Sequence, residues 1–164
     1  MGASRQTAPI IRAATRADLP RIGALGAVLV AEHYRFDPKR FLAPSDRTPE
    51  RYAAFLGSQL DDADSIVLAA EDAGTVIGYA YGTVEDYDYM SLRGPAGILQ
   101  DIVVDPAQRG RGVGRRLLDA TLARLKERGV PRVVLSTAEG NATAQNFFAR
   151  AGFRRTMIEM TRET

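Results

Sequence analysis

Residues 98–114 read ILQDIVVDPAQRGRGVG, an apolar run that is followed by three closely spaced glycines. The apolar run predicts a strand, and the residues after Gly114 predict a helix. Glycines between the two elements allow a positive φ and a close approach of the backbone to a ligand. The first turn of a helix also has unpaired N–H groups and the positive end of the helix dipole. The stretch therefore predicts an anion site, and the expected anion is a phosphate or a pyrophosphate.

Three kinds of phosphate loop have this general form, and the spacing separates them. A Walker loop needs Gly-Lys followed by Ser or Thr, whereas Gly114 is followed by Arg115 and Arg116. A dinucleotide fingerprint needs G-x-G-x-x-G, whose last position falls on Arg115 or Leu117 here. The pattern that remains is R-x-x-G-x-G, from Arg109 to Gly114.

The composition is typical of a globular protein with a single domain. Of the 164 residues, 45% are hydrophobic and 26% are charged, which suffices for one core without disulfides. Residues 1–8 show no periodicity and are expected to be a disordered N-terminus, followed by one domain at 9–164. Cysteine is absent and His33 is the only histidine. These counts exclude a thiolate nucleophile and a metal site built on several Cys or His ligands, so no metal is expected.

The charge and hydropathy pattern argues against nucleic acid and membrane partners. The formal net charge is +2, and nucleic-acid binding calls for a concentrated basic stripe rather than scattered residues. No run approaches the roughly 18 apolar residues of a membrane span. The first residues also lack the apolar centre of a signal peptide. A cytoplasmic protein is expected.

Hydrophobic periodicity predicts the element order β-α-α-β-β-β-α-β-α-β, which is an α/β fold with a mixed sheet flanked by helices. A long ordered loop is expected at 34–49. Helices are expected at about 17–33, from Thr48-Pro49 to about 60, at 112–128, and after an N-cap at Asn141. Strands are expected at 9–14, 65–72, 75–85, 98–104, 132–136 and, as an edge strand, 153–161.

Taken together, these features resemble the GNAT acyltransferase superfamily. The R-x-x-G-x-G loop has the form of its pyrophosphate loop. Residues 11–22 (IRAATRADLPRI) look like its first strand and helix, and residues 141–153 (NATAQNFFARAGF) look like its penultimate helix. The resemblance implies the GNAT fold, with a mixed, mostly antiparallel central sheet, and acetyl-coenzyme A (acetyl-CoA) as the cofactor.

The resemblance also implies where the cofactor binds. The backbone of Ile102, Val103 and Val104 is expected to pair with the pantetheine arm. Further contacts are expected from the loop and the penultimate helix: Arg109, Gly110, Arg111, Gly112, Val113, Gly114, Arg115, Asn141, Asn146 and Phe148. Arg116 is one more candidate to neutralise the phosphates. The alternative is that these arginines only solvate a surface loop.

Acetyl transfer to an amine requires a base for the amine, and the strand offers Gln100-Asp101 as the catalytic candidates. Some members of the superfamily carry Glu-Asp here, and Gln100 cannot take a proton. Asp101 is the nearest titratable group, with a purely structural carboxylate as the alternative. The superfamily often has a tyrosine acid where this chain has Phe148, which has no proton to give. Other base candidates are Glu32, His33, Glu71, Glu85 and Asp86.

Acceptor contacts are expected from two segments without a motif of their own. Around the loop at 34–49 the candidates are His33, Tyr34 and Phe36, and in the predicted hairpin they are Tyr81, Glu85 and Tyr87. An acidic, aromatic rim attracts a cationic amine. An ordinary hairpin surface or a subunit contact is the alternative.

The sequence thus predicts an N-acetyltransferase that transfers an acetyl group from acetyl-CoA directly to a primary amine of a small molecule or peptide. Direct transfer is favoured because no cysteine is available to hold an acyl group. Two alternatives remain: a non-catalytic sensor or interaction module that binds acetyl-CoA, and an enzyme that modifies tRNA or protein. Self-association through a terminal strand is common in the superfamily, so a homodimer is compatible with the resemblance.

Overall fold

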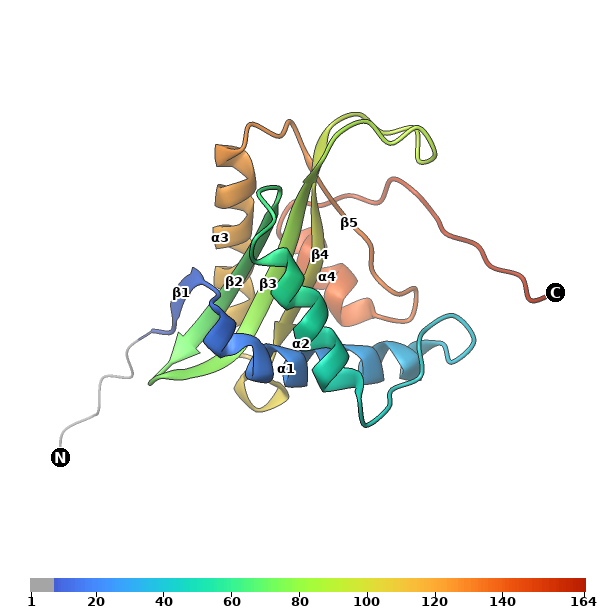
Figure 1. The fold of residues 1–164 in the computed structure, drawn as a ribbon. Helices are drawn as coiled ribbons and strands as arrows, with labels where there is room; N and C mark the ends of the chain where they lie inside the picture. Colours follow the sequence, from blue (N-terminus) through green and yellow to red (C-terminus); the bar gives the residue numbers. More distant parts are fainter. Residues whose placement is uncertain (1–7) are drawn as a thin grey trace.

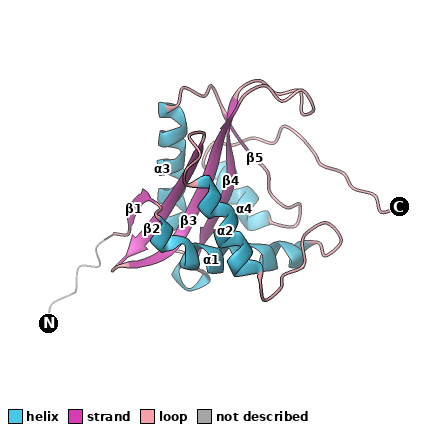
Figure 2. Cartoon of the chain, viewed as in Figure 1, coloured by secondary structure: helices cyan, strands magenta, loops and turns pink. Residues whose placement is uncertain are grey.

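The computed structural model describes residues 8–164, which form one five-stranded sheet covered by helices on both faces (Figures 1 and 2). The strand order is β1-β2-β3-β4-β5; neighbours are antiparallel except β4 and β5, which are parallel. The strands are Ile10–Ala13 (β1), Ser65–Asp72 (β2), Thr75–Glu85 (β3), Ala96–Val104 (β4) and Val133–Leu135 (β5). The helices are Leu19–Phe36 (α1), Thr48–Gln59 (α2), Val113–Glu127 (α3) and Ala142–Arg150 (α4), with 3-10 turns at Arg16–Asp18 and Pro106–Gln108.

The two faces of the sheet carry different helices. On one face α1 and α2 pack on β2, β3 and β4, with Ile22, Leu56 and Tyr79 among the buried residues. On the other face α3 packs through Leu117 and Leu125, and α4 lies beside it. In the part of the chain that the structure describes, no helix is long and apolar enough to cross a bilayer.

The expected fold class is confirmed, but the expected last strand is wrong. Residues 153–161 form no strand; this segment runs away from the sheet as an extended tail (Figure 1). Phe153 packs on Phe148, whereas Met157 and Met160 are 71% and 91% exposed. The alternation is present, but β5 has only three residues and offers a short edge. Residues 1–7, which make up most of the expected disordered N-terminus, lie outside the described residues.

A bulge in β4 decides which face Asp101 points to. Tyr81 pairs with Asp101 and Gly82 with Leu99, so Gln100 has no partner on β3. Alternation in a regular strand would put Leu99 and Asp101 on the same face. With the extra residue, Leu99 packs against Phe148 on the α3/α4 face, while the Asp101 side chain reaches Tyr52 of α2 on the opposite face.

Two glycines of α1 allow α2 to pack unusually closely. A Cβ at Gly23 would lie 2.3 Å from the Pro49 carbonyl oxygen, and a Cβ at Gly26 would lie 2.1 Å from Cδ1 of Tyr52. Both glycines lower the helix propensity of α1. Their role is to make room for α2, and Gly26 in particular seats the Tyr52 ring against α1.

Replacing Gly26 with alanine is expected to lower the free energy of unfolding by about 1–3 kcal/mol, the usual cost of overpacking. Urea denaturation measures this change. The matched control is Gly57→Ala on α2, where the new Cβ meets only a Leu19 methyl group at 3.0 Å. Both variants gain helix propensity of up to about 1 kcal/mol, so the comparison isolates the contact. Equal stabilities for the two variants would contradict the packing argument.

Candidate active site

A cavity of about 800 Å³ opens between α1, the second half of β4, the glycine-rich loop and α4. It brings together residues that are far apart in the sequence, from Leu29 on α1 to Arg150 on α4. Most of the predicted cofactor and catalytic residues line it: Gln100, Asp101, Ile102, Val103, Val104, Arg109, Gly110, Gly112, Val113, Gly114, Arg115, Asn141 and Phe148.

The glycine-rich loop ends in an open helix N-terminus. Gly110 and Gly112 adopt φ values of 79° and 77°, in the left-handed region that favours glycine. The first helical hydrogen bond of α3 runs from Arg116 N–H to the Gly112 carbonyl. The N–H groups of residues 113–115 therefore have no acceptor among residues 8–164. They point out of the helix beside the cavity, which is the arrangement that binds phosphate.

Among the described residues, one edge of β4 has no neighbouring strand along the cavity. The Asp105 N–H donates to the Ile77 carbonyl of β3 at 2.8 Å, so by alternation the polar groups of Val103 face β3, and those of Ile102 and Val104 face away. On that other side β5 pairs only with residues 97–99. Ile102 and Val104 thus present backbone groups that an extended, amide-bearing ligand can pair with.

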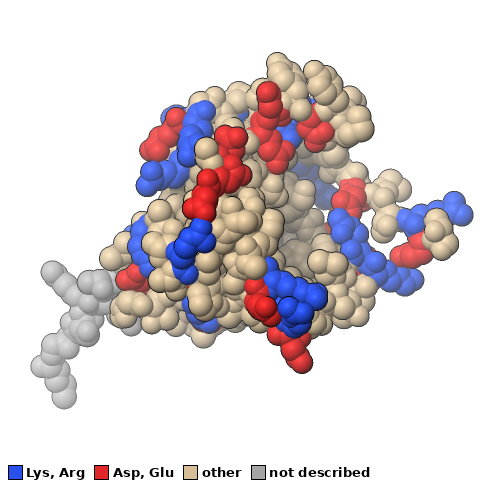
Figure 3. Space-filling model, in the orientation of Figure 1, with Lys and Arg blue, Asp and Glu red and all other residues tan. Residues whose placement is uncertain are grey.

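The loop arginines are already engaged in ion pairs. Arg109 contacts Glu32 at 2.7 Å, Arg111 contacts Asp72 at 2.9 Å, and Arg115 contacts Asp119 at 2.9 Å. Arg111 does not line the cavity, because its pair with Asp72 holds it against β2. No ion pair of Arg116 is formed within residues 8–164. Acidic and basic side chains are interspersed over the face shown in Figure 3, without a basic stripe.

Helix α4 and its N-cap contribute an amide and an aromatic ring. The Asn141 side chain caps α4 by accepting a hydrogen bond from the Ala144 N–H at 3.0 Å. Phe148 is 7% exposed, with ring centroids 5.1 Å from Phe147 and 5.7 Å from Phe153. Asn146 is exposed and does not line the cavity. Its predicted contact with the cofactor stays a prediction.

Asp101 is held by two tyrosines that the sequence analysis did not single out. The hydroxyls of Tyr52 and Tyr79 both donate to Asp101 Oδ2, the Tyr79 bond measuring 3.0 Å. Oδ1 receives no hydrogen bond within residues 8–164. Every fully buried side-chain oxygen in these residues has a hydrogen-bond partner. Oδ1 has none, so it is not fully buried and is open to the cavity that Asp101 lines. The carboxylate is therefore fixed through one oxygen and available through the other.

Burial sets the ionisation of this cluster. It raises the pKa of Asp101 above its usual value, although the Tyr52 and Tyr79 hydroxyls and the nearby His33 favour the charged form. Burial and the neighbouring Asp101 charge raise the pKa values of both tyrosines, so they stay protonated donors at neutral pH. A carboxylate with a raised pKa is a stronger base than an exposed one.

Replacing Tyr52 with phenylalanine is expected to raise the pKa of Asp101 further, because the variant lacks a donor that favours the carboxylate. With Asp101 as the expected base the ionised form is the active one, so the acid limb of the kcat/KM profile is expected to move to higher pH. The measurement is the pH profile of acetyl transfer. Ser58→Ala, which removes an exposed hydroxyl from the same helix, is the control, with an unmoved acid limb. A Tyr52→Phe profile that only drops in height would contradict this coupling.

His33 lies on the α1 wall of the same cavity. Its Nδ1 lies 2.9 Å from the Leu29 carbonyl oxygen, which can only accept, so Nδ1 carries the proton. In the neutral ring Nε2 is then a free acceptor. Phe36 also lines the cavity and meets the imidazole edge-on. Of the predicted acceptor residues, these two reach the cavity.

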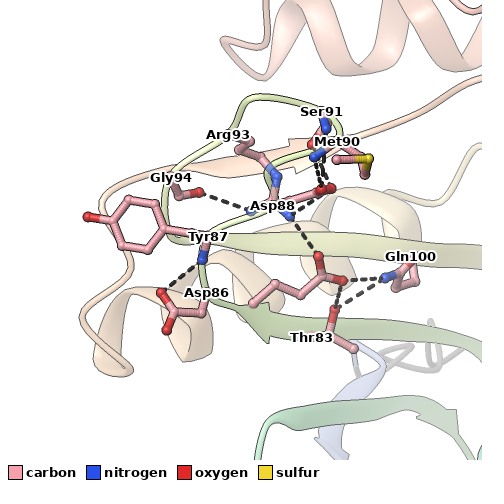
Figure 4. Close-up of polar contacts among 10 residues, drawn as sticks. Thr83, Asp86, Tyr87, Asp88, Met90, Ser91, Arg93, Gly94 and Gln100 are labelled. Carbon is pink, nitrogen blue, oxygen red and sulfur yellow. Dashed lines mark hydrogen bonds and ion pairs between the residues drawn. The ribbon is translucent and has the colours of Figure 1, made fainter.

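The predicted acidic rim lies in the β3–β4 hairpin (Figure 4). Its residues do not line the cavity. Glu85 pairs with Arg93 at 2.7 Å and also accepts from the Gln100 amide, which donates to the Thr83 hydroxyl at 3.2 Å. The Gln100 side chain is thus directed to the hairpin rather than to Asp101. Tyr34, Tyr81, Glu85 and Tyr87 do not line the cavity, and their acceptor roles stay predictions. Glu71 likewise pairs with Arg12 on β1.

A family model described as the Acetyltransferase (GNAT) family matches residues 27–153. The chain belongs to this family. The resemblance expected from the sequence is therefore confirmed, and the match includes β4, the glycine-rich loop and α4.

Relatives within the family carry names of acetyltransferases. The chain is 36% identical over 91 residues to the mycothiol acetyltransferase of Thermobispora bispora, covering 56% of this chain and 30% of that protein. It is 35% identical over 101 residues to glucosamine 6-phosphate N-acetyltransferase 1 of Oryza sativa subsp. japonica, covering 60% and 58%. The chain therefore spans less than two thirds of either relative.

Solved structures of similar fold cover nearly the whole chain. A variant of the BH1408 protein of Bacillus halodurans gives a TM-score of 0.81 at 22% identity, covering 94% of this chain and 99% of that one. The aminoglycoside N-acetyltransferase AAC(6')-Iy, solved in complex with coenzyme A (CoA), gives 0.75 at 20% identity and covers 98% of each chain. These likenesses support the GNAT fold. GNAT acetyltransferases use acetyl-CoA, which agrees with the expected cofactor.

Among residues 8–164, no three His, Cys, Asp or Glu side chains lie together in an arrangement that could hold a metal ion.

Proposed function

We propose that this protein is an acetyl-CoA-dependent N-acetyltransferase that acts on the primary amine of a small molecule. One observation carries the proposal: Asp101, with one free carboxylate oxygen, lines the same cavity as the open α3 N-terminus. The chain's residues fit the cofactor in two respects. Unpaired N–H groups at residues 113–115 suit a pyrophosphate, and the free edge at Ile102 and Val104 suits the amides of the pantetheine arm.

Removing a proton from the amine is harder than protonating the leaving thiolate. An alkylamine with a pKa of ~10.4 is neutral only about one part in a thousand near pH 7.4, a handicap of roughly 4 kcal/mol. When bound, the cofactor supplies an acetyl thioester, whose thiol has a pKa of only ~8.5 as a leaving group. The chain must therefore chiefly bind the ammonium form and take its proton. Asp101 Oδ1 is assigned that role.

Phe148 bears on the leaving group. It occupies the position where the family often has a tyrosine, and its buried ring has no proton to give. Phe148 would therefore supply no proton to the leaving thiolate. Because cysteine is absent, the acetyl group passes directly from the donor to the amine in a ternary complex.

The class of acceptor is part of the proposal. The names of the relatives and of one structural neighbour refer to mycothiol, glucosamine 6-phosphate and aminoglycosides. We expect the acceptor to be a small amine rather than a protein or tRNA. A cytoplasmic location belongs to the same proposal, since acetyl-CoA is a metabolite of the cell interior. The homodimer stays a prediction, which the molar mass in solution tests.

A thiol-release assay with acetyl-CoA tests the proposed function. The panel contains glucosamine 6-phosphate, aminoglycosides, polyamines, amino acids and peptides with a free N-terminus. Thiol release that depends on one of the small amines supports the proposal. Tight CoA binding without turnover on any amine would instead indicate the sensor alternative, and turnover on peptides alone would indicate a protein modifier.

A further inference from the structure

The Arg109 side chain connects two walls of the cavity. Its Nε donates to the Val104 carbonyl on the free edge of β4 at 3.2 Å, and its Nη2 contacts Glu32 Oε1 on α1 at 2.7 Å. Arg109, Val104 and Glu32 all line the cavity. One guanidinium thus links the ligand-pairing edge of β4 to the opposite wall.

Glu32 and Asp101 are the two carboxylates among the described residues that line this cavity, and they are held differently. Asp101 is held by neutral tyrosine hydroxyls. Glu32 is held by a cation, in a pair whose side chains are 30% and 47% exposed for Glu32 and Arg109. A partly exposed ion pair of this kind contributes little net stability and exchanges readily.

A phosphorylated donor competes for the same guanidinium. The open N-terminus of α3 lies a few residues after Arg109, and arginine binds phosphate through paired, charge-assisted hydrogen bonds. A ligand amide that pairs with β4 would also meet the Arg109 Nε at the Val104 carbonyl. A phosphate that binds the guanidinium draws Arg109 away from Glu32. The Glu32 carboxylate then faces the cavity without its cation.

We infer that Glu32 is an acceptor-binding residue that donor binding releases from Arg109. The freed carboxylate attracts the ammonium group of a cationic amine on the α1 wall, beside His33 and Phe36. The inference deepens the proposed function and rests on it. It makes acceptor affinity depend on prior occupation of the donor site.

The proposed exchange is that Arg109 leaves Glu32 for a phosphate of the donor. Calorimetric titration with CoA tests this exchange without any acceptor. The wild type, Glu32→Gln, Arg109→Gln and the double variant form a double-mutant cycle. Exchange predicts that Glu32→Gln tightens CoA binding more in the wild-type background than in the Arg109→Gln background. The expected difference is about two- to fivefold, the range for a partly exposed ion pair.

The cycle separates exchange from simple repulsion. If Glu32 only repels the anionic ligand, its replacement tightens CoA binding at least as much in the Arg109→Gln background, and the inference is wrong. Weaker binding by Glu32→Gln would also overturn it, since Glu32 would then be orienting Arg109 for phosphate. Failure of the wild type to bind CoA would refute the proposed function itself, which is a distinguishable result.

The acceptor side is tested with an amine found active in the thiol-release panel. Glu32→Gln is expected to raise the KM for the amine at least about fivefold and to change kcat less than twofold. The reason is that the variant loses a contact that stabilises the bound amine and the transition state equally. Glu127→Gln, from an exposed ion pair with Arg124, is the matched control with unchanged KM. An unchanged KM in Glu32→Gln would contradict the acceptor role.

Discussion

Asp101→Asn lowers kcat/KM for amine acetylation at least about 100-fold, the lower range for loss of a general base. Asparagine keeps an oxygen that accepts from Tyr52 and Tyr79, so the pocket wall is preserved while the proton acceptor is absent. CoA affinity is expected to stay within about twofold, because the phosphate loop and the free edge of β4 are untouched. Steady-state kinetics and calorimetry measure the two quantities.

The control for this prediction is Asp61→Asn. Asp61 is 72% exposed at its side chain and pairs with Arg16 far from the cavity, so its replacement leaves the kinetics unchanged. A threefold or smaller loss in Asp101→Asn would contradict the role of Asp101. His33, whose Nε2 is the other free acceptor on the wall, would then be the base to test.

Gly112→Val weakens CoA binding at least about tenfold. A β-branched residue is strongly disfavoured at a φ of 77°, so the turn changes conformation and the N–H groups of residues 113–115 lose their common direction. Helix α3 itself remains, because Leu117 and Leu125 bury it against the sheet. Calorimetric titration with CoA measures the loss.

Gly129→Val is a matched control for the same backbone strain. Gly129 has a φ of 75° and open space around its Cβ position, as Gly112 has, but it follows the other end of α3. Both variants are expected to lose similar stability, and only Gly112→Val is expected to lose CoA affinity. Equal CoA affinities would show that the turn at Gly112 does not shape the phosphate site.

The geometry of the glycine-rich loop could be predicted because its determinants are local. A strand, two glycines and a helix start are encoded within residues 98–114, and the structure places them as expected. The free edge of β4 agrees with the expected pantetheine contacts for the same reason. The position of the Arg111 side chain could not be predicted from the loop, because its partner Asp72 lies on β2 and no local pattern indicates the pair.

The surroundings of Asp101 could not be predicted because they depend on tertiary packing. Tyr52 reaches Asp101 only because Gly26 lets α2 approach α1, and the bulge at Gln100 turns Asp101 to that face. Hydrophobic periodicity predicted the helix that carries Tyr52, but no local pattern indicates the partner of its hydroxyl. The expected strand at 153–161 failed for the converse reason: its alternation was real, but a strand also needs a partner edge.

Mass spectrometry of the acceptor after incubation with acetyl-CoA tests the central claim most directly, comparing the wild type with Asp101→Asn. The account predicts that the wild type converts a small primary amine to its N-acetyl form and that the variant does so at least about 100-fold more slowly. It is contradicted if the wild type binds acetyl-CoA but leaves every amine of the panel unmodified, or if the variant acetylates as fast as the wild type.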